Sequence, residues 1–267
     1  MTKVKDIVSV IERIAPLRLQ EDYDNAGYQV GDPETEVTKV LTCLDVTEAT
    51  IDQAIACGAQ IVVSHHPLLF RPIRRITPAD YISRVIIKAI SNGIAIYSAH
   101  TNLDNAFGGV NYKMAEVLGL NNVKPLAPLP AEKTAGMENA SMCGSGIVGT
   151  LAEPLPADAF IAKIKDVFHA DNIRTNIDAP VNYQPSIISS KPITKVALCG
   201  GSGSEFISNA ERCGADAYLT GEIGYHRFFG HDNILLVEAG HYETEQYTCN
   251  LLSDIIGNTF PNIEIIK

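Results

Sequence analysis

The sequence has 267 residues, of which 46% are hydrophobic, and it carries a formal net charge of −10. This size allows one large or two medium cores, and the acidic balance disfavours nonspecific binding to nucleic acid. No apolar run approaches the length of a membrane span, and charges interrupt the N-terminal segment, which predicts an amphipathic helix and not a signal peptide. We expect a cytoplasmic protein without a membrane segment.

The first predicted unit is a strand, a helix and a second strand, at Lys39–Leu44, Ala49–Cys57 and Ile61–Ser64. The pair His65-His66 follows at once, and Pro67 prevents the strand from continuing. Two adjacent imidazoles held at a strand end can each bind a metal ion.

One spacing then occurs twice, as His100-x-x-x-Asp104 and His241-x-x-x-Glu245. Each copy follows an apolar run and precedes a predicted helix; the runs are Gly93–Tyr97 and Asn233–Val237, and the helices are Val110–Leu118 and Gln246–Ile256. If a helix begins between them, a histidine and a carboxylate at i and i+4 face the same way.

A lone pair of this kind is usually ordinary helix-end chemistry. Three such sites, each at the end of a strand, favour a metal centre instead. One zinc ion takes about three or four protein ligands, whereas five or six nitrogen and oxygen donors suit two metal ions about 3.5–4 Å apart. We therefore predict a dinuclear site, and the donor types suit Zn, Mn, Fe or Ni.

An internal repeat accounts for the two copies of the spacing. Aligning 39–66 with 195–222, at an offset of 195 − 39 = 156, gives eight identities in 28 positions, where composition alone gives roughly two. We expect an internally duplicated α/β protein, with two similar α/β/α domains, mixed sheets and the metal site between the repeats. The predicted domains are a first repeat at 1–120, a middle segment at 121–194 and a second repeat at 195–267.

The middle segment differs in character, with many prolines, and is expected to begin as a loop. A short strand at Ile147–Leu151 and an amphipathic helix at Ala157–Phe168 follow, because apolar residues recur there at helical spacing. We expect this segment to pack with the second domain.

Three further features each leave two interpretations open. Gly221-Glu222 takes the place of His65-His66 in the second repeat, so Glu222 either supports the metal site or substrate, or is a structural carboxylate. Arg71, in a basic cluster after the histidine pair, either meets a substrate phosphate or lines the surface. The turn Gly200–Gly203, with Gly201 and Gly203 as candidates, either cradles an anion or allows tight packing.

Over nearly its whole length the chain resembles the GTP cyclohydrolase 1 type 2 homologues, also called YbgI-like or NGG-interacting-factor-three-like proteins. The motifs that carry the resemblance are Asp24-Asn25-Ala26-Gly27, Leu44-Asp45-Val46-Thr47, Ser64-His65-His66-Pro67, His100-Thr101-Asn102-Leu103-Asp104, Gly200-Gly201-Ser202-Gly203, Thr220-Gly221-Glu222 and Gly240-His241-x-x-x-Glu245. Two positions depart from the family pattern, with Tyr23 in place of a common tryptophan and Ile147 in place of a common arginine.

The resemblance implies two divalent metal ions bound by His65, His66, Asp104, His241 and Glu245, with Glu245 as the bridge. It places His100 near the metal ions; Asp45 and Glu222 are further candidates for a supporting or catalytic role. It also implies a homohexameric ring built from dimers.

These residues predict a dinuclear-metal-dependent hydrolase with a small-molecule substrate, for which the family name suggests GTP or a related nucleotide. Attack on the purine imidazole carbon would release formate, and phosphoester hydrolysis uses the same parts. The alternative is a non-catalytic metal-binding or regulatory assembly protein, because histidine and carboxylate ligands serve both roles.

Overall fold

The computed structural model describes residues 1–177 and 191–267, which form two compact units. The first unit comprises Met1–Ala106 and Thr248–Lys267, and the second comprises Phe107–Tyr247. The stretch 178–190 of the predicted middle segment lies outside the described residues. Among the helices that the structure describes, none has the length and apolarity needed to cross a bilayer.

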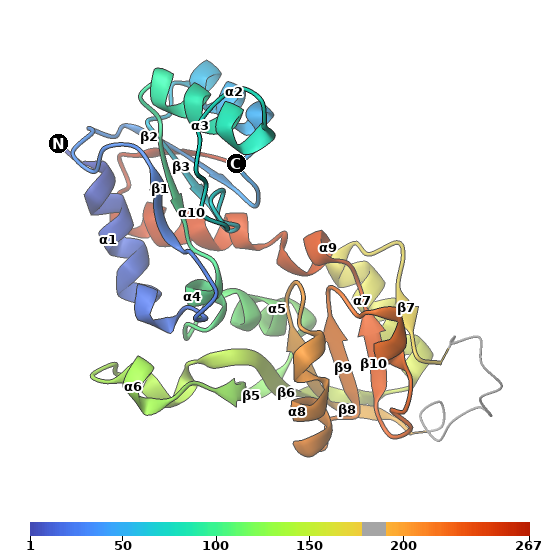
Figure 1. The fold of residues 1–267 in the computed structure, drawn as a ribbon. Helices are drawn as coiled ribbons and strands as arrows, with labels where there is room; N and C mark the ends of the chain where they lie inside the picture. The colour runs from blue at the N-terminus through green and yellow to red at the C-terminus, as the bar shows by residue number, and fades with distance from the viewer. Residues whose placement is uncertain (178–190) are drawn as a thin grey trace. The chain divides into compact units, whose positions relative to one another are not determined.

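The first unit contains a five-stranded mixed sheet (Figure 1). The strands lie in the order β1 (Gly27–Val30), β4 (Ala95–Ser98), β3 (Ile61–Ser64), β2 (Lys39–Cys43) and β11 (Glu264–Ile266). Only β1 is antiparallel to its neighbour; the other strands run parallel. All residues of β3 and β4 are buried, as expected for parallel strands covered on both faces.

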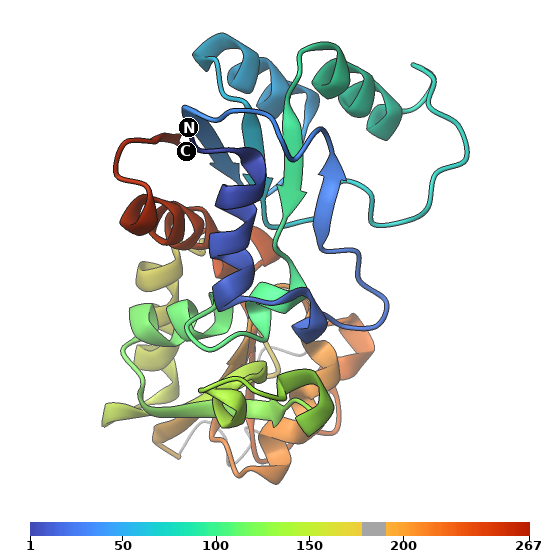
Figure 2. The ribbon, with the colours of Figure 1, turned by 90° about the vertical axis from the view of Figure 1, so that its left-hand side faces the viewer.

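Two pairs of helices cover the two faces of this sheet (Figures 1 and 2). α2 (Glu48–Cys57) and α3 (Tyr81–Ser91) share a core with alternate strand residues, such as Leu41 and Val62. On the other face α1 (Val4–Ile14) packs against α10 (Thr248–Thr259), and α10 contacts β2. The hydroxyls of Thr42 and Ser253 lie 3.0 Å apart in this packing.

The second unit contains a six-stranded mixed sheet. Its order is β5 (Asn121–Pro128), β6 (Gly144–Leu155), β8 (Ile193–Cys199), β9 (Ala217–Thr220), β10 (Leu235–Glu238) and β7 (Arg174–Thr175). β8, β9 and β10 are parallel, and the remaining pairings are antiparallel.

Helices cover both faces of this second sheet too. α5 (Val110–Leu118) and α7 (Ala157–Phe168) share one core cluster with it, and α8 (Ile207–Arg212) shares another. The short helices among the described residues are η1 (Leu17–Leu19), α4 (Thr101–Asp104), α6 (Ala131–Thr134), η2 (Ala140–Met142), η4 (Ser204–Phe206), η5 (Tyr225–Phe228) and α9 (His241–Glu245). The predicted α/β class with mixed sheets is confirmed.

The start of the middle segment is a strand, so the predicted loop there is wrong. β5 pairs antiparallel with β6, which is also longer than the predicted strand at Ile147–Leu151. β5 tolerates Pro125 and Pro128 because it is an edge strand, where a missing N–H leaves no partner strand unsatisfied.

The compact units are bounded differently from the predicted domains. The helix expected to close the second repeat is α10, which belongs to the first unit, whereas α5, from the first repeat, belongs to the second. Met114 and Leu118 of α5 pack in one core with Phe160 of α7. The chain thus passes from one unit to the other after Ala106 and again after Tyr247. The duplication itself stays a prediction.

The burial of α10 predicts that the first unit depends on the last part of the chain. Leu252 is fully buried on this helix, so Leu252→Ala should lower the free energy of unfolding by about 3 kcal/mol. The exposed Asp254 on the same helix is the matched control, and Asp254→Ala should change it by less than about 0.5 kcal/mol. Urea denaturation checks both; equal effects would contradict this packing.

Candidate metal centre

The strand end after β3 holds the histidine pair in a fixed backbone conformation. The N–H groups of His65 and His66 donate to carbonyls at the end of β2, 3.1 and 2.9 Å away. The buried hydroxyls of Ser64 and Ser98 both donate to the carbonyl of His66, at 2.9 and 3.3 Å. The side chains therefore leave the sheet from a backbone that is hydrogen-bonded on both sides.

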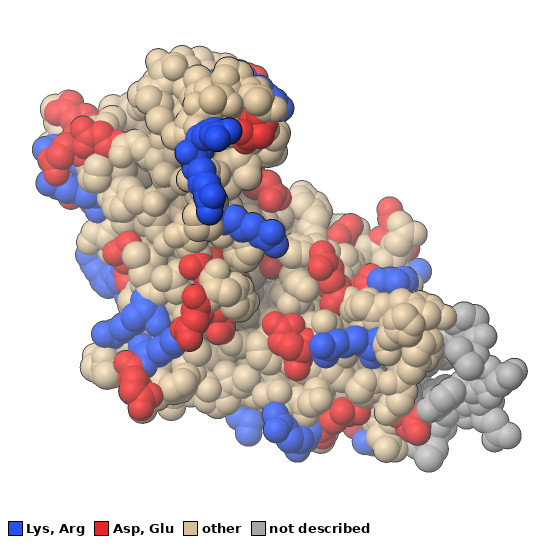
Figure 3. Space-filling model, in the orientation of Figure 1, with Lys and Arg blue, Asp and Glu red and all other residues tan. Residues whose placement is uncertain are grey.

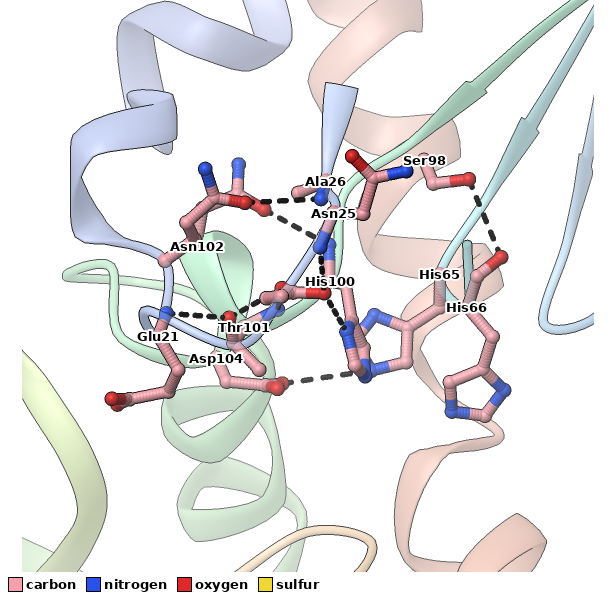
Figure 4. A network of polar contacts seen from close by, with 12 residues as sticks. Glu21, Asn25, Ala26, His65, His66, Ser98, His100, Thr101, Asn102 and Asp104 are labelled. Atoms are coloured by element: carbon pink, nitrogen blue, oxygen red, sulfur yellow. Dashed lines mark hydrogen bonds and ion pairs between the residues drawn. The ribbon is translucent and has the colours of Figure 1, made fainter. Parts of the chain in front are cut away.

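Three imidazoles cluster at this end of the first sheet (Figure 4). The ring centroids of His65, His66 and His100 are 4.9 to 5.5 Å apart. Each ring offers a nitrogen, and the three nitrogens lie within 4.8 Å of one another. Neutral imidazole nitrogens grouped in this way are suited to a transition-metal ion.

The tautomer of His65 follows from its surroundings. Its Nδ1 lies 2.8 Å from the carbonyl oxygen of Ala99. A carbonyl can only accept, so Nδ1 carries the proton and Nε2 of the neutral ring presents a lone pair. Nε2 lies 3.6 Å from Oδ1 of Asp104, which is longer than a hydrogen bond. A nitrogen and an oxygen that both present lone pairs across this distance fit a bound cation.

The three other candidate histidines, His66, His100 and His241, follow the same rule. In each ring Nδ1 lies within hydrogen-bond distance of a carboxylate oxygen: 2.9 Å for His66 and Asp45, 2.7 Å for His100 and Asp24, and 2.8 Å for His241 and Glu222. Metal-binding histidines almost always donate their second ring N–H to a carbonyl or carboxylate. The residues present therefore fit the metal that the resemblance implies.

Asp24 is a buried carboxylate that organises the loop around His100. It accepts from Nδ1 of His100 and from both the N–H and the hydroxyl of Thr101. Burial raises the pKa of Asp24, but the hydrogen bonds and charge of His100 and the bonds from Thr101 outweigh this and hold it at about 2. The sequence assigned Asp24 no role; its only signal was the motif that continues with Asn25.

The spacing His-x-x-x-acid has a different outcome in each unit. His241 begins α9 and Glu245 ends it one turn later, with 3.1 Å between Nε2 and Oε2. In the first unit α4 begins directly after His100, but that ring is bonded to Asp24, and Asp104 faces His65 instead. In the second unit the helix therefore brings the histidine and the carboxylate together. In the first unit each of the two residues instead contacts a partner that is distant in the sequence.

The glycine-rich turn after β8 packs closely against Glu245, which is only 4% exposed. A Cβ on Gly201, where φ is +59°, would lie 2.3 Å from Oε1 of Glu245. Three N–H groups of the turn already have acceptors inside the protein, since Gly200, Gly201 and Gly203 donate to the side chains of Asn111, Thr244 and Thr220. This favours the packing interpretation over an anion cradle.

Arg71 lies on an exposed loop of the first unit, at a hollow of about 420 Å³. Figure 3 shows basic side chains over the front of this unit, where the loop before α3 lies. Asp45 and Glu222 also reach solvent, with side chains 60% and 56% exposed. The structure thus places Arg71 on the same unit as the three clustered histidines.

The depressed pKa of Asp24 predicts a pH-dependent contribution to stability. Because its pKa in the fold is below the ordinary value of 3.8, the stabilisation is present above about pH 4 and is lost as the pH falls towards 2. Asp24→Asn should lower the free energy of unfolding at pH 7 by roughly 1–2 kcal/mol, and the difference should shrink below pH 4. Asp171→Asn, at an exposed position, is the control. Denaturation at several pH values measures both, and a pH-independent difference would count against this role.

Comparison with known proteins places the chain. The sequence profile of the family described as Duf34/NIF3 (NGG1p interacting factor 3) matches residues 2–267. A "GTP cyclohydrolase 1 type 2 homolog" of Clostridium perfringens is 36% identical over 245 residues, which cover 91% of this chain and 87% of the relative. A protein of the same description from Clostridium acetobutylicum is 35% identical over 246 residues, covering 91% and 85%.

Two solved structures have a similar fold over nearly the whole chain. The Staphylococcus aureus protein SA1388 has a TM-score of 0.84 at 26% identity and covers 99% of this chain and 95% of its own. A Bacillus cereus protein related to NIF3 has a TM-score of 0.83 at 25% identity, with 99% and 96% covered. With the family profile matched over nearly every residue, the chain belongs to the Duf34/NIF3 family.

Proposed function

We propose that the protein is a metal-dependent hydrolase in which His65, His66, Asp104, His241 and Glu245 hold two divalent cations. The observation that carries this proposal is the shared bonding of the histidines. Each uses Nδ1 on an oxygen acceptor, which leaves Nε2 for a metal. The arrangement occurs in both units, at His65 and His66 in the first and at His241 in the second.

The donor set also indicates what kind of substrate suits the centre. Three neutral imidazoles and two carboxylates supply a charge of −2 against the +4 of two divalent cations. The remaining positive charge favours an anionic substrate such as a nucleotide. Zinc, manganese, iron and nickel all accept this mixture of ligands. When bound, the two cations would acidify a water molecule and polarise the substrate.

The carboxylates that bond to the histidines differ in their exposure to solvent, and we assign them different roles on that basis. The side chain of Asp24 is buried and bonded to Nδ1 of His100, so its role is to orient that ring. Asp45 and Glu222 accept from His66 and His241 while open to water, so each can relay a proton between the site and solvent. These two carboxylates are our candidates for proton transfer.

The described relatives are named GTP cyclohydrolase 1 type 2 homologs, and we propose GTP or a related nucleotide as the substrate. Hydrolysis at the purine imidazole carbon would consume two water molecules: the first opens the ring by breaking one C–N bond and leaves an N-formyl group, and the second breaks the remaining C–N bond to release formate and a free amine. Phosphoester hydrolysis would release phosphate instead.

The function is tested by incubating metal-loaded protein with GTP and simple phosphoesters while measuring formate and phosphate. Turnover is expected, and Glu245→Gln should abolish it together with metal binding, because this change removes a charge that offsets the cations. Metal content is measured in parallel by elemental analysis. Full metal occupancy without either product would overturn the hydrolase and favour a non-catalytic metal-binding protein.

The packing of Glu245 against the glycine turn generates a second prediction. Gly201→Ala should displace the carboxylate and lower metal affinity about 10- to 100-fold, because the new Cβ meets Oε1 at 2.3 Å and Nε2 of His241 at 3.1 Å. Isothermal titration with zinc or manganese measures the affinity.

Gly214→Ala is the matched control for this substitution. Gly214 has a similar positive φ of +70°, but a Cβ there meets nothing within 4 Å. Both variants should lose a similar amount of stability from backbone strain, and only Gly201→Ala should lose metal. Equal metal affinity in the two variants would show that Glu245 is not a ligand.

A further inference from the structure

The hollow in the first unit lies beside the histidine cluster. It measures about 420 Å³ and is lined by Tyr23, Asp24, Asn25 and the segment Leu69–Ile73. Two hydrogen bonds hold that segment in place: Nδ2 of Asn25 donates to the carbonyl of Leu69 at 2.7 Å, and the N–H of Leu69 donates to Gln29 at 3.0 Å. The cavity is therefore formed before any ligand binds, and its volume falls in the range of small-molecule sites.

Two aromatic rings on this hollow remain open to solvent. The ring centroids of Tyr23 and Phe70 are 6.4 Å apart with 65° between their planes, an edge-to-face arrangement. Tyr23 is 64% exposed and Phe70 is 43% exposed. Large aromatic side chains grouped at a cavity offer a surface on which a planar ring can stack.

Arg71 supplies a positive charge at the same hollow. Within the part of the chain that the structure describes, its guanidinium makes no ion pair, so it is available to a ligand. Guanidinium groups bind phosphate through two parallel hydrogen bonds. Although the chain as a whole has a net charge of −10, this hollow thus combines a positive charge with exposed aromatic rings.

The hollow adjoins the histidines through two of its lining residues. The ring centroid of Phe70 lies 6.1 Å from that of His100. Asp24, on the wall, accepts the 2.7 Å hydrogen bond from Nδ1 of His100. A ligand in the hollow would therefore lie against the residues that position this histidine.

We propose that this hollow recognises a nucleotide, with the base stacked on Tyr23, its rim against Phe70 and a phosphate held by Arg71. The choice of a nucleotide rests on the proposed function, but binding is measurable without turnover. In this arrangement Tyr23, Phe70 and Arg71 determine specificity and take no part in bond breaking.

The test uses the absence of tryptophan from the sequence. Tyr23→Trp places a single indole on the hollow, where a stacked base quenches its fluorescence. Full-length protein carrying this change is titrated with GTP, guanosine and tripolyphosphate, both metal-loaded and after chelation. The chelated arm removes any phosphate contact with metal. Circular dichroism checks the fold, and calorimetry with the parent protein checks the affinity without the reporter.

We expect saturable quenching by GTP in both arms and binding of guanosine about tenfold weaker. In the reporter background Arg71→Met should weaken GTP about tenfold and leave guanosine unchanged. Phe70→Ala should weaken both about tenfold, through loss of the aromatic contact beside the base. Arg212→Met is the matched control, because Arg212 ends α8 in the second unit, and it should change neither affinity.

Absence of GTP binding in both fluorescence and calorimetry would overturn the inference, as would equal effects of Arg71→Met and Arg212→Met. The same measurements test the recognition site and the hydrolase separately. Binding that depends on Arg71 and Phe70 without formate or phosphate release supports the recognition site and contradicts the hydrolase. Turnover that is unchanged in both variants contradicts the recognition site and leaves the hydrolase standing.

Discussion

One hydrogen bond per histidine, from Nδ1 to an oxygen, is the constraint on which the site depends. It sets the tautomer, fixes the ring plane and selects Nε2 as the nitrogen that a metal can use. The acceptors are chemically varied, since a backbone carbonyl serves His65 and carboxylates serve the others. The four histidines share the direction of this hydrogen bond and differ in the acceptor.

These hydrogen bonds require that the backbone of the histidines is held in place, and the two units do this in different ways. In the first unit the hydrogen bonds between the parallel strands β2 and β3 continue to the backbone of His65 and His66, so the buried sheet holds the backbone that carries these imidazoles. In the second unit support comes from close backbone contact. Gly201 and Gly221 pack where any side chain would collide, which holds α9 against the turn after β8.

The exchange of helices between the units links the ligands to the cores. Asp104 lies two residues before the chain leaves the first unit, and Glu245 lies two residues before it returns. Each of these two candidate ligands is therefore followed by a helix, α5 or α10, that belongs to the other unit.

Local periodicity and spacing predicted the positions of the strands, the histidine pair at a strand end, the two His-x-x-x-acid spacings and the amphipathic helix at Ala157–Phe168. Contacts between distant parts of the chain decide the rest. Asp24 bonds to His100 76 residues away, and the proline-containing segment β5 is an edge strand. Helix α5 packs in the second unit and α10 in the first, each outside the repeat to which the sequence assigned it. These outcomes depend on which distant surfaces meet, and local pattern carries no record of that choice because the same amphipathic helix can cover either sheet.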